Sequence, residues 1–189
     1  LGVLQRIGLV YFITLLIVLY CASRGRILWL LGLCAVYLLA MLFVPYQDAQ
    51  GNQFRGLLLF GNSFAAWLDH TVLGAGHVYY RTATPFAFDP EGLLSTLPAV
   101  VSVLVGYYVA ARLVQHSPRA GALWLVKFAA VLFIAAWLCS TFWPVNKALW
   151  SGSYVLLSSA ILLLILAVLV WVSDVMAKRA LVQPLITYG

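Results

Sequence analysis

The chain has 189 residues, of which 65% are hydrophobic and only 8% are Asp, Glu, Lys or Arg. Soluble globular domains are about half apolar and about a quarter charged, so this composition excludes an ordinary water-soluble fold. Intrinsic disorder requires low hydrophobicity, and nucleic-acid binding requires a concentrated basic patch, which a net charge of +6 spread over the whole chain does not supply. The composition therefore indicates an integral membrane protein.

Five segments are long and apolar enough to cross a hydrocarbon core of about 30 Å as helices. Backbone groups in lipid must be hydrogen-bonded within a span, and these segments lack the alternation of apolar and polar residues that barrel strands show. We therefore predict an all-α polytopic bundle, a single transmembrane unit over residues 1–189. The predicted spans are residues 7–22, 27–45, 93–111, 121–143 and 154–173, and residues 46–92 form a long, structured extracytoplasmic loop.

Lys and Arg residues are concentrated in the short loops on one side of these spans. They are Arg24, Arg26, Arg112, Arg119, Lys178 and Arg179. Because short cytoplasmic loops are enriched in Lys and Arg, this side is predicted to be cytoplasmic and the long loop external. The chain opens directly into a span, without an initiator Met or a cleavable leader, and stops abruptly at Gly189. We therefore expect an internal part of a longer polytopic protein.

Metal and nucleotide motifs are missing from the sequence. Cys21, Cys34 and Cys139 occur singly within apolar stretches, without a CxxC pair or a Cys/His cluster. We predict that they are small buried hydrophobic residues, and no metal site is expected.

The external loop is too apolar for a disordered linker, and loops of this length are often functional. Asn62 can cap a short helix in which Phe64, Trp67 and Leu68 share one face. That face would lie on the membrane interface or cover the bundle, and Asp69 would project near the end of the helix.

The string Asp89-Pro90-Glu91-Gly92 is typical of a helix start. Asp89 is a good N-cap residue, and Pro90 suits the first helical position. Glu91 is either a partner of the positive end of the helix dipole or a carboxylate at the mouth of a cavity. Pro98 is expected to free a backbone carbonyl within the span and to kink the helix, which is one way to open such a cavity.

Polar residues also interrupt the outer turn between the fourth and fifth spans. Asn146 and Lys147 lie there between Trp143 and Trp150. They form either an interfacial turn with Trp anchors or an Asn/Lys pair that faces the acidic loop and binds an anionic group. At the outer start of the first span, Arg6 is either an interfacial anchor or, as an ionisable residue in a membrane, a functional group.

Four strings follow one another along the chain. They are Gly2-Val3-Leu4-Gln5-Arg6-Ile7; Asn62 followed by Leu68-Asp69 and Leu73-Gly74 with His77 and Tyr79; Asp89-Pro90-Glu91-Gly92-Leu93-Leu94-Ser95-Thr96-Leu97-Pro98; and Pro144-Val145-Asn146-Lys147 with Leu149-Trp150. In order and approximate spacing they resemble the heparan-α-glucosaminide N-acetyltransferase family and its bacterial relatives, which are transmembrane acyltransferases. The resemblance covers nearly the whole chain, although position 70 is His where relatives often carry Arg.

The resemblance implies an enzyme that takes acetyl groups from acetyl-CoA and delivers them to an amino sugar across the membrane. It implies an integral protein of the bacterial inner membrane whose partners are lipid, acetyl-CoA and the amino sugar, with no nucleic acid; a homo-oligomer stays open. The family's proposed catalytic histidine lies in early spans that we expect outside this chain, so this part alone is expected to be inactive.

Acyl transfer to an amine needs a base that deprotonates the amine and donors that stabilise the developing oxyanion. The candidates for the catalytic base or its orienting partner are Asp89, Glu91 and His77. The candidates for substrate or cofactor binding are Asn146, Lys147, Arg6, Gln5 and Asp69. Both sets require two of these strings, the one that contains Asp89 to Gly92 and the one around Asn146, to emerge on the same face of the membrane and to meet there. We call these two the outer strings. A small-molecule transporter or channel is the alternative function, and it would place ionisable groups within the spans.

Overall fold

The computed structural model describes residues 2–178 together with Gln183 and Thr187. Five helices of this part of the chain are long and apolar enough to cross a membrane, which confirms the predicted all-α polytopic architecture. They are α1 (Val3–Tyr20), α2 (Ser23–Phe43), α4 (Thr96–Leu113), α5 (Pro118–Ser140) and α6 (Gly152–Val170), which continues into the short π-helix η2 (Trp171–Val175).

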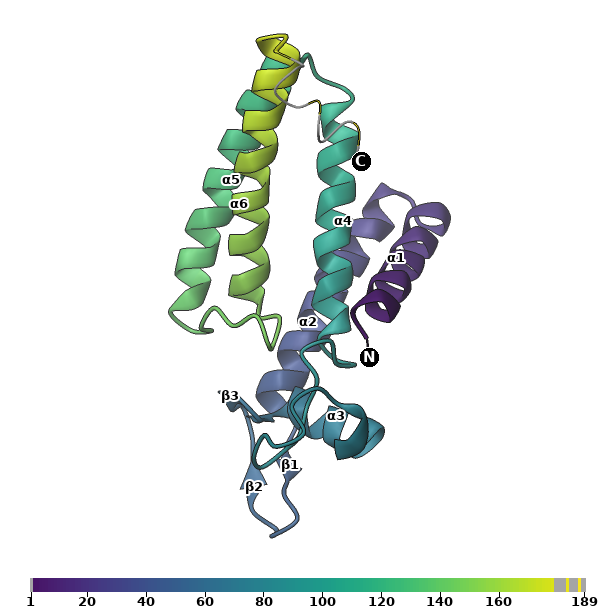
Figure 1. Ribbon diagram of the computed structural model, residues 1–189, viewed down its shortest axis with the longest axis vertical. Helices are drawn as coiled ribbons and strands as arrows, with labels where there is room; N and C mark the ends of the chain where they lie inside the picture. Colours follow the sequence, from purple (N-terminus) through teal and green to yellow (C-terminus); the bar gives the residue numbers. More distant parts are fainter. Residues whose placement is uncertain (1, 179–182, 184–186, 188–189) are drawn as a thin grey trace.

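The spanning helices form two groups (Figure 1). α4 packs against α1 and α2, while α5 runs alongside α6, and α4 also touches α6. Buried Val10 of α1 meets Val100 and Leu104 of α4, and Leu125 of α5 meets Leu163 of α6. The α1–α2 and α4–α5 turns lie at the end of the bundle away from the external loop (Figure 1).

The external loop is structured. Two short antiparallel pairs, β1 (Tyr46–Gln47) with β2 (Gln53–Phe54) and β3 (Leu58–Leu59) with β4 (Asn62–Ser63), lead into α3 (Phe64–Leu73). A 3₁₀ turn, η1 (Ala75–His77), and a bridge between Tyr80 and Phe88 complete it. The loop has its own core because apolar side chains from β1, β2, α3 and the segment between Tyr80 and Phe88 gather in it. Its buried members are Tyr46, Ala66, Phe86 and Phe88.

The short helix expected after Asn62 is present as α3, but the prediction that Asn62 caps it is wrong. The N-cap is Ser63, whose Oγ accepts a hydrogen bond from the backbone N–H of Ala66 at 3.2 Å. Asn62 is paired with Leu59 in the β3–β4 ladder, and its Oδ1 accepts a hydrogen bond from the Tyr46 hydroxyl at 3.1 Å. Strand pairing therefore moves the helix start by one residue.

The third span also begins later than its sequence predicts. α4 starts at Thr96, so Asp89 is not its N-cap and Pro90 is not its first residue. Pro98 is the third residue of the helix, in the first turn, where backbone N–H groups have no intrahelical partner in any case. The expectation that Pro98 frees a carbonyl inside the span and kinks it is therefore wrong.

Candidate functional site

Arg6 is buried inside the transmembrane part of the protein, with 4% of its surface exposed. Its Nη1 donates a hydrogen bond to the Pro90 carbonyl at 2.9 Å, and its Nη2 donates to the Ser95 carbonyl at 2.7 Å. The guanidinium carbon lies 4.3 Å from the ring centroid of Trp150. A charged side chain at this depth is costly unless it is well partnered, and these contacts supply the partners. Arg6 thereby joins α1, the start of α4 and the α5–α6 turn.

Three carboxylates of the external loop lie around this guanidinium. Glu91, Asp89 and Asp69 all interact electrostatically with Arg6, and Glu91 interacts most strongly. Asp69 and Asp89 are buried, whereas Glu91 is half-buried. The sequence-predicted residues Arg6, Asp69, Asp89 and Glu91 are therefore brought together. When the acids are ionised, negative charge exceeds positive charge in this cluster.

Asp69 of α3 holds the turn that carries the other two acids. Its Oδ1 accepts a hydrogen bond from the Leu93 N–H at 2.9 Å, and its Oδ2 accepts one from the Asp89 N–H at 3.4 Å. Burial raises the pKa of Asp69 to about 6, even though both N–H donors act to lower it. Gly92 fits this close approach, because a Cβ atom there would lie 2.0 Å from Asp69 Oδ2.

Side chains of the segment itself stabilise it as a turn instead of a helix. Asp89 Oδ1 accepts a hydrogen bond from the Glu91 N–H at 2.9 Å. The Ser95 hydroxyl donates to the Pro90 carbonyl at 3.1 Å, and the Thr96 hydroxyl donates to the Gly92 carbonyl at 2.9 Å. These bonds, together with those from Asp69 and Arg6, fix the backbone of Glu91 beside α1.

A groove of about 320 Å³ lies next to this turn, between α1 and α4. Pockets for small molecules usually measure about 300–1,000 Å³, so the groove is at the lower end of that range. Its apolar walls are formed by Val3, Ile7, Val10, Tyr11, Ala99 and Val103. Its polar residues are Arg6, Glu91, Ser102 and Trp150.

The α5–α6 turn supplies Trp150. Asn146 Oδ1 accepts hydrogen bonds from the N–H groups of Ala148 at 2.9 Å and Leu149 at 3.3 Å, and its own N–H donates to Ser151 Oγ at 3.0 Å. Trp150 has a φ of 53°, in the left-handed region that side chains other than glycine rarely adopt. Asn146 thus acts on the site by stabilising the turn that places Trp150 over Arg6.

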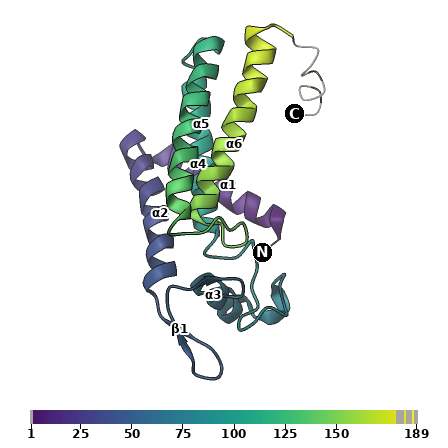
Figure 2. The ribbon, with the colours of Figure 1, turned by 90° about the vertical axis from the view of Figure 1, so that its left-hand side faces the viewer.

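The helix α2 holds the same turn from its other side. The Tyr37 hydroxyl donates a hydrogen bond to the Leu149 carbonyl, and the Tyr37 ring stacks on Trp143 with 5.5 Å between ring centroids. Leu94 belongs to the same buried cluster. The two outer strings therefore lie at one end of the bundle (Figures 1 and 2). They meet there through Arg6 and this apolar cluster.

Three other predicted site residues lie outside the groove lining. The Gln5 side-chain oxygen accepts a hydrogen bond from the Gly2 N–H at 3.0 Å, at the start of α1. His77 is exposed, with its Nδ1 3.1 Å from the Leu73 carbonyl oxygen. Lys147 is exposed on the outer turn.

Trp150, Ser95 and Ser102 contribute to the site and were not predicted as site residues. A tryptophan at the end of a span is usually an interfacial anchor, so sequence reasoning gives Trp150 that role. The serines are common residues of transmembrane helices. Their contribution depends on the approach of α1 to α4, and no spacing within the sequence signals it.

The groove does not fit the phosphates of acetyl-CoA. Arg6 is the one cation among the residues that line it, and its guanidinium already donates to two carbonyls and faces three carboxylates. Repulsion from these carboxylates disfavours a polyanion and favours a neutral or cationic ligand. Among the described residues, no group of three or more His, Cys, Asp and Glu side chains is arranged to hold a metal ion.

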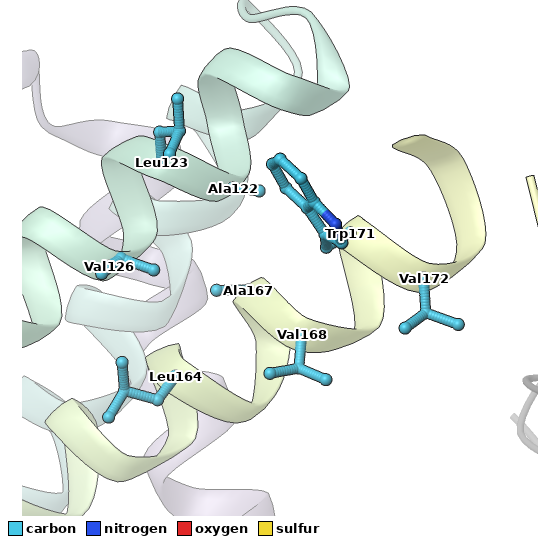
Figure 3. A pocket seen from close by; sticks show the side chains of 8 residues that line it. All are labelled: Ala122, Leu123, Val126, Leu164, Ala167, Val168, Trp171 and Val172. Atoms are coloured by element: carbon cyan, nitrogen blue, oxygen red, sulfur yellow. The ribbon is translucent and has the colours of Figure 1, made fainter. Parts of the chain in front are cut away.

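A second groove, of about 240 Å³, lies between α5 and α6 at the other end of the bundle (Figure 3). Its lining includes Val126, Ala167 and Trp171 and contains no titratable side chain. It therefore offers no group for acid–base chemistry.

Comparison with known proteins supports the family resemblance, although no family model matches the chain. The chain is similar to human heparan-alpha-glucosaminide N-acetyltransferase, with 29% identity over 224 aligned positions that cover 92% of this chain and 33% of the human protein. The mouse protein of the same name is 28% identical over the same shares of both chains. The chain thus spans about a third of the length of these curated relatives. Over nearly its whole length the chain is similar to the heparan-alpha-glucosaminide N-acetyltransferases, and it carries five helices long and apolar enough to span a membrane.

Proposed function

We propose that this chain is part of a transmembrane N-acetyltransferase and that the groove beside Arg6 binds the acceptor amine. The observation that carries the proposal is the Glu91 side chain, which lines the groove, while Asp69 and Asp89 are buried nearby around Arg6. Amines are cationic at neutral pH, and a carboxylate in a groove attracts them. The names of the relatives, heparan-alpha-glucosaminide N-acetyltransferases, support an amino sugar as the acceptor.

Glu91 is the residue to which we assign the chemistry of the amine. Its side chain lines the groove and is half-buried, and its carboxylate accepts no hydrogen bond from a described residue. An ammonium group has no lone pair, so it must lose a proton before its nitrogen can attack an acetyl carbonyl. A carboxylate within hydrogen-bonding distance binds the ammonium group and accepts that proton.

The neighbouring residues position Glu91 and the acceptor. Asp69 uses both carboxylate oxygens on backbone N–H groups, and Arg6 uses two nitrogens on backbone carbonyls, so both act through the turn. The Nε1 of Trp150 is buried without a hydrogen-bond partner in the described part of the chain. The Trp150 ring itself positions Arg6, because the guanidinium carbon lies 4.3 Å from the ring centroid.

The acetyl donor is proposed to be acetyl-CoA, bound by parts of the full-length protein other than this groove. The asymmetry of Lys and Arg puts the groove on the non-cytoplasmic face. In a bacterium this is the periplasmic face of the inner membrane. The acceptor would then receive its acetyl group on the side of the membrane opposite the cytoplasmic donor pool.

The test is acetyl transfer from acetyl-CoA to glucosamine by the full-length protein carrying Glu91→Gln. General acid–base catalysis contributes about 10²–10⁴-fold, so kcat/KM is expected to fall by at least about 100-fold. The matched control is Asp174→Asn, which removes an exposed acid in η2 and is expected to leave kcat/KM within about two-fold of the wild type. A wild-type rate in Glu91→Gln would overturn the role of Glu91. Failure of the wild-type protein to acetylate any amine would overturn the transferase proposal itself.

A further inference from the structure

The groove combines charged side chains with apolar walls, as a binding site for an amphipathic molecule does. Its two charged groups, Arg6 and Glu91, lie beside the outer turn, and most of its other lining residues are apolar. The α1 residues along it run from Val3 to Tyr11, which corresponds to about 12 Å of helix. A ligand that fills this space needs a polar, cationic head and an apolar body.

The α1 wall of the groove is also open to the side. Val3, Ile7 and Tyr11 remain 57%, 59% and 64% exposed, although they belong to a helix that is long and apolar enough to span the membrane. Surfaces of this kind within a span face hydrocarbon. A molecule dissolved in the outer leaflet could therefore enter the groove laterally.

We propose that the acceptor is a lipid-linked amine: an amino sugar head on a hydrocarbon anchor. This inference rests on the proposed function and specifies its substrate class. The amino group lies at Glu91, a sugar hydroxyl donates a hydrogen bond to Ser102 Oγ, whose own hydrogen is donated to the Pro98 carbonyl, and the first part of the anchor lies along the walls of α1 and α4. Because such an acceptor is confined to the membrane, the enzyme does not have to bind it from aqueous solution.

Two other occupants fit less well. A free amino sugar that filled the groove would bring several hydroxyl groups against mostly apolar walls, in which Tyr11 and Ser102 carry the hydroxyl groups, and each unpaired buried hydroxyl costs free energy. The pantetheine arm of coenzyme A carries two amides and meets the same walls. A hydrocarbon chain needs no hydrogen-bonding partner there.

The test compares methyl and dodecyl glycosides of glucosamine as acceptors for the full-length protein in lipid nanodiscs, with acetyl-CoA as donor. Val103→Trp fills the groove from α4, and Ile7→Trp fills it from α1. Each variant is expected to lower kcat/KM for the dodecyl glycoside about ten-fold or more, and by a clearly larger factor than kcat/KM for the methyl glycoside, because only the dodecyl chain needs the space that the indole fills. The control is Val126→Trp, which lies in the α5–α6 groove (Figure 3) and is expected to change neither value by more than about two-fold.

The outcomes separate the two proposals. Equal losses for both glycosides in Val103→Trp and Ile7→Trp would show that the groove holds something other than the anchor, such as another helix of the full-length protein, and would overturn this inference alone. Unchanged turnover of the dodecyl glycoside in both variants would also overturn it alone. If the wild-type protein acetylates neither glycoside, the proposed function fails and this inference fails with it.

Discussion

Gly92 shows how close the outer turn comes to α3. A side chain at this position has no space, since its Cβ would lie 2.0 Å from Asp69 Oδ2 and 2.6 Å from Asp69 Cγ. Asp69 is almost fully buried and its carboxylate is bound to two backbone N–H groups, so it cannot move away without losing them.

We expect Gly92→Ala to lower the free energy of unfolding by about 1–3 kcal/mol, the usual cost of overpacking a buried site. The measurement is the thermal or denaturant-induced unfolding of the purified protein in detergent. Gly106→Ala is the matched control, because a Cβ there meets nothing within 4 Å. Equal stability of the two variants would contradict the close approach of Gly92 to Asp69.

Asp69 makes the stability of the turn depend on pH. Burial raises its pKa to about 6 from its usual value of 3.8, so the folded protein binds this proton more tightly than the unfolded chain. Stability decreases with pH wherever the folded state binds more protons. The contribution of Asp69 is therefore most favourable below about pH 4 and declines until about pH 6.

The corresponding experiment measures Tm between about pH 4 and pH 7 for the wild-type protein and for Asp69→Asn, which cannot ionise. We expect the Tm of the wild type to fall relative to that of the variant as the pH rises. Taking the difference removes the effect of the other titratable groups, Asp89 and Glu91 among them. A difference that stays constant with pH, or that changes in the opposite direction, would refute the raised pKa.

At the scale of the secondary-structure elements, α3 places Asp69, and its first turn depends on one serine. The Ser63 hydroxyl is fully buried and is the side chain that caps the helix. By contrast, Ser117 precedes α5 without forming a side-chain cap. The two serines therefore form a matched pair at the starts of two helices.

Ser63→Ala is expected to destabilise the protein by about 1 kcal/mol, because the N–H of Ala66 loses its acceptor. Ser117→Ala is expected to be close to neutral. Both values come from unfolding of the purified protein under identical conditions. A cost for Ser117→Ala as large as that for Ser63→Ala would show that the hydrogen bond to Ala66 is not the cause.

The start of α4 shows which element boundaries could be predicted. Asp89 and Pro90 carry a helix-start pattern, and local propensity alone would begin a helix there. Asp69 accepts two tertiary hydrogen bonds from this segment and Arg6 donates two to it, and these bonds stabilise a turn over the same residues instead. Residues far away in the sequence therefore decide where α4 begins.

For the whole molecule, both outer strings lie at one end of the bundle and the short basic turns at the other (Figure 1). The prediction that the basic end is cytoplasmic follows from the positive-inside rule. It can be tested with single cysteines in a background without Cys21, Cys34 and Cys139. Suitable exposed positions are Gln50, between β1 and β2, and Gln115, between α4 and α5.

We expect Gln50→Cys to react with a membrane-impermeant maleimide in intact cells and Gln115→Cys to react only after permeabilisation. Labelling is read by mass shift on a gel. The opposite pattern would place the groove on the cytoplasmic face. Acceptor and donor would then meet on the same side of the membrane.

The sequence by itself determined the class of protein and its number of spans. A long apolar segment in hydrocarbon forms a helix because its backbone N–H and C=O groups must be hydrogen-bonded within the segment. It also determined the short helix of the external loop and the family resemblance, because both depend on local patterns. Only the tertiary structure decided that Arg6 is the centre of the site, that Trp150 covers it and that Asn146 acts through its turn. The roles of Arg6 and Trp150 come from contacts between residues more than 80 positions apart, as between Arg6 and Pro90. The physical reason is that a buried charge is stable only when nearby groups compensate for its lost hydration. The packing of the helices decides which groups lie close enough to Arg6 to do so.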